Sequence, residues 1–469
     1  MPNPKTTEDF VNNFWDENIV PTITEYIRIP NKSPAFDPDW DKHGHMEDAL
    51  QLAKKWIEDH QIPGAELHVG RLEGRTPLLL LDVPGDLDRT IMMYGHLDKQ
   101  PEMTGWREDL GPWIPKFEDG KLYGRGGADD GYALFASMCA IKALKEQGVK
   151  HARCVIMIEF SEESGSPDLP PYVDHFKDII GDVDLVICLD SGAGNYDQLW
   201  STTSLRGMIG GSVRVDILRE GVHSGDASGV VPSSFRILRQ LLNRLEDADT
   251  GKIVLDALHD EIPQQRIDQA GLVAESLGDE VYTKFPFLDG AAPMGTERVE
   301  LILNRTWRPT LSYIGQDGLP PTQTGGNVLR PHTELKLSFR LPPTLDSEAA
   351  KKVIHDTLSA NPPYNAKVTV DFEDAANGWN APELADWLGD TLNEVSNTFY
   401  GKPALHMGEG GSIPFMGMLG EKFPQAQFVV TGVLGPASNA HGPNEFLHVP
   451  YAKKLTCCVA HILARHAEL

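Results

Sequence analysis

The sequence has few cysteines, few basic residues relative to acidic ones, and no long apolar run. Its five cysteines are scattered, so we predict reduced thiols packed in a core rather than a disulfide framework. With 42 basic and 68 acidic residues the net charge is −26, which argues against nucleic acid or an anionic membrane as a partner. No apolar stretch reaches the ~20 residues of a membrane span, and the first residues lack a signal-peptide pattern. We therefore expect a cytoplasmic protein.

The length of 469 residues predicts two domains, because a single hydrophobic core stops growing at about 250–300 residues. Within the first 206 residues, short apolar runs alternate with helical periodicity, which is typical of an α/β fold with a mostly parallel sheet. The same pattern returns near the end of the chain. We therefore expect one α/β domain, formed by residues 1–206 and 381–469, that is interrupted by an inserted domain.

The inserted domain, residues 207–380, shows a different pattern. Polar and apolar residues alternate in "GSVRVDIL", as they do in a half-exposed antiparallel strand. The predicted element order is β-α-β-β-α-β, a ferredoxin-like α+β plan, with one strand expected at about 300–314. Residues 247–299 are expected to form helices and loops.

Acidic or histidine residues follow several predicted strands. The run "TIMMYGHLD" ends on His96 and Asp98, which lie two residues apart and therefore point to the same face. Comparable residues occur in "GRGGADDG" (Asp129, Asp130), "EFSEESGS" (Glu162, Glu163) and "VICLDSG" (Asp190). Open α/β sheets build their sites at the carboxyl ends of strands, so we expect these side chains to gather at one place.

Such a cluster predicts a metal site. Carboxylates within ~4–6 Å raise one another's pKa, and a divalent cation is the usual compensation. Because the candidate ligands are histidines and carboxylates without cysteine, Zn²⁺ is favoured, with Mn²⁺ or Co²⁺ as competitors.

Five strings occur in a fixed order along the chain: "YGHLD", "GRGGADD", "EESGS", "GVHSG" and "NAHGPNE". With these strings and the inserted domain, the chain resembles the M20 family of metallopeptidases, in particular its dipeptidase and carnosinase-like branch, over nearly its whole length. The resemblance implies a di-metal exopeptidase catalytic domain and an inserted domain that serves as lid and dimerisation domain. It implies hydrolysis of dipeptides or similar small peptides by a homodimer.

The resemblance also implies five metal ligands: His96, Asp129, Glu163, Asp190 and His441. Asp129 would bridge two metal ions about 3.5–4 Å apart, which would polarise the scissile carbonyl and generate a bridging hydroxide. Glu162 would be the general base. Asp98 would accept a hydrogen bond from the far ring nitrogen of His96 and orient it. A cis peptide bond is expected between Asp129 and Asp130.

Four residues are implied as substrate contacts. His223, in "GVHSG", would reach the active site of the partner subunit and stabilise the oxyanion. Arg340 would bind the substrate's carboxylate with its guanidinium. Asn327 and Ser412, the latter in "GGSIP", are further candidates.

The chain departs from the family pattern at four positions. Gly131 and Tyr132 follow the two aspartates where the family commonly has lysine and glycine, Gly408 replaces an arginine before "EGGSIP", and Asn327 replaces threonine. The expected ligands are untouched, so we expect these changes to affect the choice of substrate rather than the reaction.

Alternatives stay open from the sequence. An aminoacylase or carboxypeptidase that acts on N-acyl amino acids would use the same chemistry. A catalytically inactive metal-binding relative is a different class, against which the presence of Glu162 argues. A third class of function is an assembly module built on the inserted domain. The sequence excludes a serine hydrolase of the G-x-S-x-G type, since no such motif occurs.

Overall fold

The computed structural model describes residues 1–469 except for the side chain of Pro414. By its internal contacts the chain divides into two compact units. Unit 1 comprises Met1–Thr203, Ala381–His406 and Met418–Leu469, and unit 2 comprises Ser204–Asn380 and Met407–Gly417. The short segment Met407–Gly417 thus belongs to unit 2 by contact, within a range that the sequence predicts as part of the first domain. The roles predicted for the two domains stay predictions.

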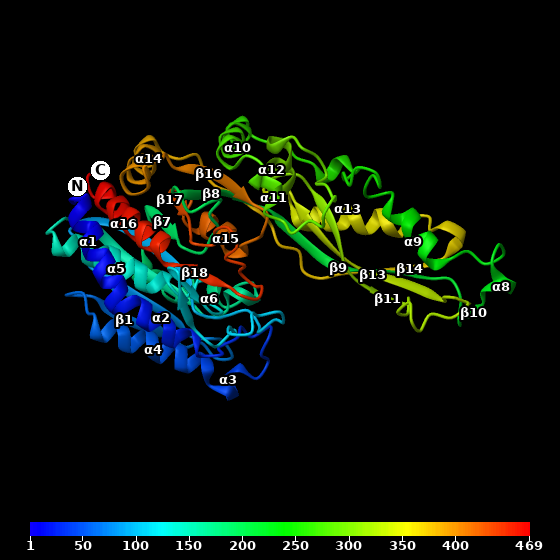
Figure 1. Cartoon of the computed structure of the whole chain (residues 1–469), viewed down its shortest axis with the longest axis horizontal. Helices are drawn as coiled ribbons and strands as arrows, with labels where there is room; N and C mark the ends of the chain where they lie inside the picture. Colours follow the sequence, from blue (N-terminus) through cyan, green and yellow to red (C-terminus); the bar gives the residue numbers. More distant parts are fainter. The chain divides into compact units, whose positions relative to one another are not determined.

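Unit 1 alternates strands and helices along the chain (Figure 1). Its elements are α1 (Pro4–Phe14), the π-helix η1 (Trp15–Ile19), α2 (Val20–Ile27), α3 (Trp40–His43), α4 (His45–Asp59), β1 (Glu66–Gly70), β2 (Leu78–Val83), β3 (Leu87–His96), β4 (Lys116–Glu118), β5 (Lys121–Tyr123), α5 (Ala133–Glu146), β6 (Ala152–Glu159), η2 (Glu162–Ser164), α6 (Leu169–His175), α7 (Lys177–Ile180), β7 (Leu185–Cys188), α14 (Asp386–Tyr400), β17 (Gln427–Val430), β18 (Phe446–His448) and α16 (Val449–His466). Three elements cross a unit boundary along the chain: β8 (Trp200–Leu205), β16 (Leu405–Glu409) and α15 (Pro414–Lys422).

The main sheet of unit 1 has the order β1-β2-β6-β3-β7-β17. Strand β3 runs parallel to both β6 and β7, and β17 runs parallel to β7, whereas β1 and β2 form an antiparallel edge. The central strands are apolar throughout because helices cover both faces of such a sheet, and residues 90–96 of β3 are all buried. The predicted mixed α/β fold with a mostly parallel sheet is confirmed.

Three helices of unit 1 pack closely together. Helices α1, α5 and α16 contact one another, and α5 lies against β3 (Figure 1). Helix α5 is apolar almost all round and nearly fully buried, as expected for a helix enclosed between other elements. The two ends of the chain also meet here, where the amino group of Met1 lies 3.0 Å from Glu468 Oε1. None of the helices that the structure describes has the length and apolarity of a membrane span.

Unit 2 is an α+β unit. Its elements are β9 (Gly207–Asp216), β10 (Val222–His223), α8 (Ser224–Ala227), α9 (Ser234–Leu242), η3 (Asp256–Leu258), α10 (Gln264–Leu277), α11 (Glu280–Thr283), α12 (Arg298–Thr306), β11 (Thr310–Asp317), β12 (Val328–Leu329), β13 (His332–Leu341), α13 (Ser347–Ser359), η4 (Pro363–Asn365), β14 (Lys367–Phe372) and β15 (Trp379–Asn380). Four antiparallel strands form a sheet in the order β11-β13-β9-β14, and helices α9 and α13 pack against it (Figure 1). The buried side chains of these two helices share one core with the sheet.

One element of the inserted domain was predicted wrongly. Residues 298–306, the first part of the expected strand at about 300–314, form helix α12, and the strand begins only at Thr310. The buried residues of α12 are Ile302, Leu303 and Thr306, which follow helical spacing. A short apolar run such as "LIL" does not by itself separate a strand from a helix.

Candidate metal centre

Aligned strand ends bring the predicted ligands of unit 1 together. In the parallel pairs, His96 of β3 lies opposite Glu159 of β6, and Tyr94 lies opposite Cys188 of β7. The three strands therefore stop at nearly the same level. The turns that follow them carry Asp98, the Glu162–Glu163 pair and Asp190, as expected for a site at the carboxyl edge of a parallel sheet.

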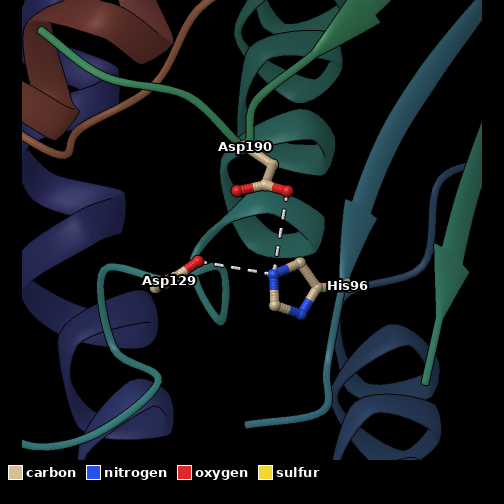
Figure 2. A group of neighbouring side chains, drawn as sticks. All are labelled: His96, Asp129 and Asp190. Atoms are coloured by element: carbon tan, nitrogen blue, oxygen red, sulfur yellow. Dashed lines mark ion pairs between the residues drawn. The ribbon is translucent and has the colours of Figure 1, made fainter. Parts of the chain in front are cut away.

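The first group of possible ligands consists of His96, Asp129 and Asp190 (Figure 2). The ring nitrogen Nε2 of His96 lies 3.5 Å from Asp129 Oδ1 and 3.8 Å from Asp190 Oδ2. All three residues are buried. Their nearest oxygen and nitrogen atoms all lie within 4.8 Å of one another, which is the spacing that one ion could span.

The second group consists of Asp129, Glu163 and His441. Nε2 of His441 lies 3.0 Å from Asp129 Oδ2 and 3.4 Å from Glu163 Oε2. The side chain of His441 is 55% exposed, and it reaches the centre from a loop in which its own φ is +64°. Asp129 belongs to both groups, with one carboxylate oxygen toward each histidine. The peptide bond between Asp129 and Asp130 is cis, as predicted.

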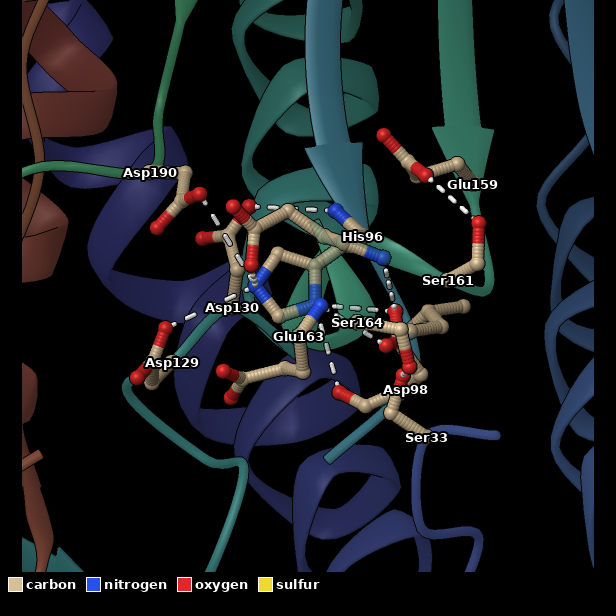
Figure 3. Close-up of polar contacts among 12 residues, drawn as sticks. Ser33, His96, Asp98, Asp129, Asp130, Glu159, Ser161, Glu163, Ser164 and Asp190 are labelled. Atoms are coloured by element: carbon tan, nitrogen blue, oxygen red, sulfur yellow. Dashed lines mark hydrogen bonds and ion pairs between the residues drawn. The ribbon is translucent and has the colours of Figure 1, made fainter. Parts of the chain in front are cut away.

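Asp98 lies behind His96 and is fully buried (Figure 3). Its Oδ1 lies 3.3 Å from Nδ1 of His96, whose other near contact is the carbonyl oxygen of Asp98 at 3.2 Å. The same carboxylate accepts the backbone N–H of Glu162 at 3.1 Å and of Glu163 at 3.0 Å. The side chain of Asp98 therefore fixes the position of the His96 ring relative to the η2 turn.

Glu162 lies at the edge of the first group. Its Oε2 is 3.9 Å from His96 Nε2, and its side chain is 13% exposed. Burial raises the pKa of Glu162 well above its ordinary value, and the Asp190 carboxylate raises it further. A carboxyl group whose pKa is raised in this way is suited to exchange protons near neutral pH.

The charges of the centre are unbalanced without a cation. Burial raises the pKa of Asp190 to about 6, and burial together with Asp129 raises that of Glu163. Burial alone would lower the pKa of His96, yet its close contacts with the carboxylates of Asp129 and Asp98 hold it well above its usual range. Burial would raise the pKa of Asp129, but its contacts with His441 and His96 lower it. Protons on the histidines thus offset part of the negative charge, a role that a divalent ion fills more completely.

The residues present fit divalent metal ions. Nε2 of His96 and Oε1 of Glu163 are buried and have no hydrogen-bond partner among the described residues. Buried polar atoms are normally paired, so atoms left unpaired at one place point to a missing ligand. The donor set of two histidines and three carboxylates, without cysteine, suits zinc and other first-row divalent ions.

Sequence reasoning missed several residues that hold this centre. Gln100, which the sequence analysis does not single out, donates its side-chain amide to Glu163 Oε2 at 2.6 Å. Arg125 and Glu445 form a buried ion pair at 2.5 Å between two loops of the site. Both lie inside the quoted strings "GRGGADD" and "NAHGPNE", but nothing in a linear sequence shows that they pair.

The remaining predicted residues lie in unit 2, in two places. His223 and Asn327 come together where β10 pairs with β12: His223 lies opposite Val328, and the carbonyl of Asn327 accepts the N–H of Ser224 at 2.9 Å. Both side chains are exposed. Arg340 and Ser412 form the second place, where Nη1 of Arg340 donates to Ser412 Oγ at 2.9 Å.

Comparison with known proteins identifies the family. The profile of peptidase family M20/M25/M40 matches residues 92–465, which is well over half of the chain. The chain belongs to this family. It is therefore an M20-type metallopeptidase, from a family whose members bind divalent metal ions.

Among the curated relatives of this M20 peptidase, the cysteinylglycine-S-conjugate dipeptidase of Corynebacterium striatum is 30% identical over 464 residues, covering 92% of this chain and 96% of the relative. The Beta-Ala-His dipeptidase of Homo sapiens is 28% identical over 433 residues, covering 86% and 82%.

Solved structures share the fold. The dipeptidase Dug1p from Saccharomyces cerevisiae has a TM-score of 0.78 at 20% identity, covering 100% of this chain and 99% of that one. Human carnosine dipeptidase 1 has a TM-score of 0.77 at 22% identity, with complete coverage of both chains.

Proposed function

We propose that this M20 peptidase is a di-metal dipeptidase that hydrolyses the amide bond of dipeptides or similar small peptides. The observation that carries the proposal is the pair of ligand groups that share Asp129, because a shared carboxylate between two three-residue sets suits two metal ions. Relatives of 30% and 28% identity over most of their length are named dipeptidases, which supports the substrate class.

The proposed ligands divide into two sets. His96 and Asp190 hold one ion, Glu163 and His441 hold the other, and Asp129 bridges both. Zn²⁺ is the proposed metal on the donor types, with Mn²⁺ or Co²⁺ as alternatives. When bound, such ions polarise a carbonyl and lower the pKa of water.

Glu162 is the proposed general base. It takes a proton from the attacking water and returns the proton to the leaving amine. Support comes from its raised pKa, from its position 3.9 Å from Nε2 of His96, and from the hydrogen bond through which Asp98 fixes its backbone. Asp98 is proposed to orient both His96 and this turn, without touching the substrate.

Unit 2 supplies the proposed substrate contacts. Nδ1 of His223 accepts the N–H of Gly225 at 3.1 Å, which leaves the proton of a neutral ring on Nε2, where it can donate to an oxyanion. Arg340, held by Ser412, is proposed to bind the carboxylate of the substrate, and Asn327 is proposed to lie near the scissile bond. These roles make unit 1 the catalytic domain and unit 2 the lid.

We also propose that the protein is a homodimer joined through unit 2. Several parts of unit 2 expose large apolar side chains: the edge strand β11 with Ile314 (59%) and Tyr313 (46%), strand β12 with Val328 (40%), helix α9 with Phe235 (40%), and the loop before α9 with Val230 (82%). Exposed apolar side chains on an unpaired sheet edge suit contact with another chain. A cytoplasmic location is proposed on the five cysteines, all of which are buried and free.

The variant Glu162→Gln tests the proposal. We expect it to bind two equivalents of zinc, measured by plasma emission spectroscopy after dialysis, and to lose at least about 10²-fold in kcat, because the proton acceptor is gone. Glu102→Gln, which removes the exposed partner of Lys32, is the matched control and should keep wild-type turnover. Near-normal turnover of Glu162→Gln would remove this residue as the base.

The substrate class is tested separately. A panel of dipeptides and N-acetyl amino acids, assayed with added Zn²⁺ or Mn²⁺, should show hydrolysis of the dipeptides. Hydrolysis of the N-acetyl series alone would make the protein an aminoacylase or carboxypeptidase. Two bound metals without hydrolysis of either series would mark a catalytically inactive relative.

A further inference from the structure

Three guanidinium groups lie close together in unit 2 without an acidic partner. Arg206, Arg305 and Arg340 form no ion pair with any of the residues that the structure describes. Three other arginines of unit 2 contrast with them: Arg214, Arg298 and Arg308 each pair with a carboxylate. Unbalanced cations that are not fully solvated are unfavourable unless a ligand supplies the missing charge.

Arg206 is the buried member of the three, with 7% of its surface exposed. Its guanidinium donates to the carbonyl oxygens of Gly410, Asn304 and Arg308 and to the hydroxyl of Thr310, over 3.0–3.3 Å. Burial, together with the charges of Arg340 and Arg305, lowers the pKa of Arg206 to about 9. Arg206 therefore ties the end of α12 to the loop at 410–412, and its neighbours on both sides are cations.

Arg340 faces the same loop from strand β13. Its Nη1 donates to Ser412 Oγ, and Ser412 in turn donates to the carbonyl oxygen of Arg206. The hydroxyl of Ser412 thus holds Arg340 in place with a neutral contact, and the guanidinium keeps donors for one carboxylate.

Arg305 comes from the last turn of α12 and runs along the same loop. A Cβ atom at Gly410 would meet its carbonyl oxygen at 3.1 Å and its Cγ at 3.3 Å. Among the residues that the structure describes, the guanidinium of Arg305 has one acceptor, Met407 Sδ at 3.2 Å, and a thioether is a weak acceptor. Arg305 is half-buried, so part of this residue is open to water or a ligand.

The close approach of α12 depends on Gly408. A Cβ atom at Gly408 would lie 2.3 Å from Ser204 Oγ and 2.9 Å from Thr306 Cβ, so no other residue fits without a shift. Thr306 neighbours Arg305 on the helix. The absence of a side chain at position 408 therefore lets the helix bring its own arginine to the loop.

We propose that Arg305 and Arg340, positioned by Arg206, form a subsite for a substrate whose C-terminal residue carries a second carboxylate. The inference rests on the proposed dipeptidase function and specifies its substrates as dipeptides that end in aspartate or glutamate. The α-carboxylate binds Arg340, and the side-chain carboxylate binds Arg305. Three cations face a single negative charge when the C-terminal residue is neutral, whereas two negative charges leave a much smaller imbalance.

Other charged residues nearby do not change the net charge of the three-arginine cluster. Burial and the charge of Arg305 lower the pKa of Lys284 to about 8, and the Glu409 carboxylate acts in the opposite direction. Lys284 and Glu409 bring formal charges of opposite sign, so the excess of positive charge from the three arginines is unchanged.

The test compares kcat/KM of the zinc-loaded enzyme for four substrates, Ala-Glu, Ala-Gln, Ala-Asp and Ala-Asn. Glutamate and glutamine have the same shape, so their ratio isolates the charge. We expect the acidic member of each pair to be favoured by about 10- to 100-fold, the range of one charge-assisted contact. Equal values for acid and amide would overturn the proposal.

The variants assign this preference to Arg305. Arg305→Met should bring the ratio of Ala-Glu to Ala-Gln close to one, and Arg305→Lys should restore part of it. Arg308→Met is the matched control: its guanidinium is already paired with Glu300 at 2.8 Å, and the ratio should stay at the wild-type value. A ratio that survives in Arg305→Met would assign the preference elsewhere and overturn the proposal.

Failure of the subsite is distinguishable from failure of the function. Hydrolysis of all four dipeptides at equal rates rejects the subsite and keeps the dipeptidase. If none is hydrolysed, the dipeptidase proposal fails, and calorimetric titration with L-glutamate and L-glutamine then tests the subsite alone. Tighter binding of glutamate that is lost in Arg305→Met supports the subsite, and equal binding rejects it.

Discussion

Asp98 accepts backbone N–H groups from two residues with different proposed roles, the base Glu162 and the ligand Glu163, while its Oδ1 faces the ring of His96. A carboxylate has two oxygens with several lone pairs, so it can serve all three contacts at once. An amide of the same size cannot, because one of its two heavy atoms is a donor. The shape of the centre therefore depends on the charge state of a residue that is not itself a proposed ligand.

Asp98→Asn tests this dependence. The side-chain NH₂ would face either a backbone N–H or the ring nitrogen of His96, so we expect the η2 turn to shift and zinc affinity to fall by about 10- to 100-fold. Competition with a chromogenic chelator measures the affinity. Asp82→Asn, which breaks the Arg153 pair in the same sheet, is the control and should keep zinc affinity. Wild-type affinity in Asp98→Asn would reject the orienting role.

Gly131, one of the two glycine departures from the family pattern, shows how a single residue can mislead a prediction from sequence. The sequence indicated a lost cation at Gly131, yet a Cβ there would meet the ring of Tyr26 at 2.3 Å, and the fully buried Lys99 lies over that same ring at 3.9 Å. Lys99 donates to the carbonyls of Tyr26 and Ile29, both at 2.7 Å. A lysine from another strand end thus lies beside this position, and only the folded chain shows that the two positions are neighbours.

The place of the metal centre could be predicted from the secondary structure, because its residues follow the ends of predicted strands. The buried runs before His96, Glu162 and Asp190 are unambiguous in the sequence, and parallel strands in register leave their carboxyl ends at one edge. Helix α12 was not predictable in the same way, because its apolar residues are few and its packing partners are α10, α11 and Gly408 of β16. Because this segment was predicted as a strand, the sequence analysis did not identify Arg305, which lies in the last turn of the helix.

Two loops of unit 1 are joined by the buried pair Arg125–Glu445. Arg125 also donates to the carbonyl of Gly442 at 2.8 Å, and Glu445 Oε1 accepts the N–H of Gly126 at 3.0 Å. The loop that begins at His441 is thereby fixed to the loop that leads to Asp129. His441 itself is exposed and has no strand to hold it, so this pair is what determines its position.

Arg125→Met should separate the two loops. Loss of one partner leaves the Glu445 carboxylate buried and unpaired, so we expect the free energy of unfolding to fall by about 3–5 kcal/mol. The double variant Arg125→Met/Glu445→Met should recover part of this loss, because no charge is then left unpaired. Urea unfolding of the metal-free proteins measures both. A double variant no more stable than Arg125→Met would show that the hydrogen bonds, and not the charges, hold the loops.

For the molecule as a whole, the sequence predicted an interrupted α/β domain, and the structure has two compact units with unit 1 built from three chain segments. The change from buried runs to alternating strands near residue 207 is a local signal and can be read directly. The assignment of Met407–Gly417 to unit 2 is not local: it follows from hydrogen bonds such as that from Arg206 N–H to the carbonyl of Gly411 at 3.1 Å. Contacts between residues 200 positions apart leave no pattern in either segment.

The final prediction concerns the assembly and the placement of His223. His223→Ala should lower kcat by about 10²–10³-fold, the usual effect of losing one oxyanion donor, and leave the dimer intact in sedimentation analysis. Co-expressed His223→Ala and Glu162→Gln subunits form half of their dimers as mixed pairs, and each mixed pair has one complete site if His223 acts across the dimer. Activity should then return to about a quarter of the wild-type value. The matched control combines Glu162→Gln with Glu163→Gln, where every site lacks a residue and no recovery is expected. If the first mixture also stays inactive, His223 acts within its own subunit or not at all.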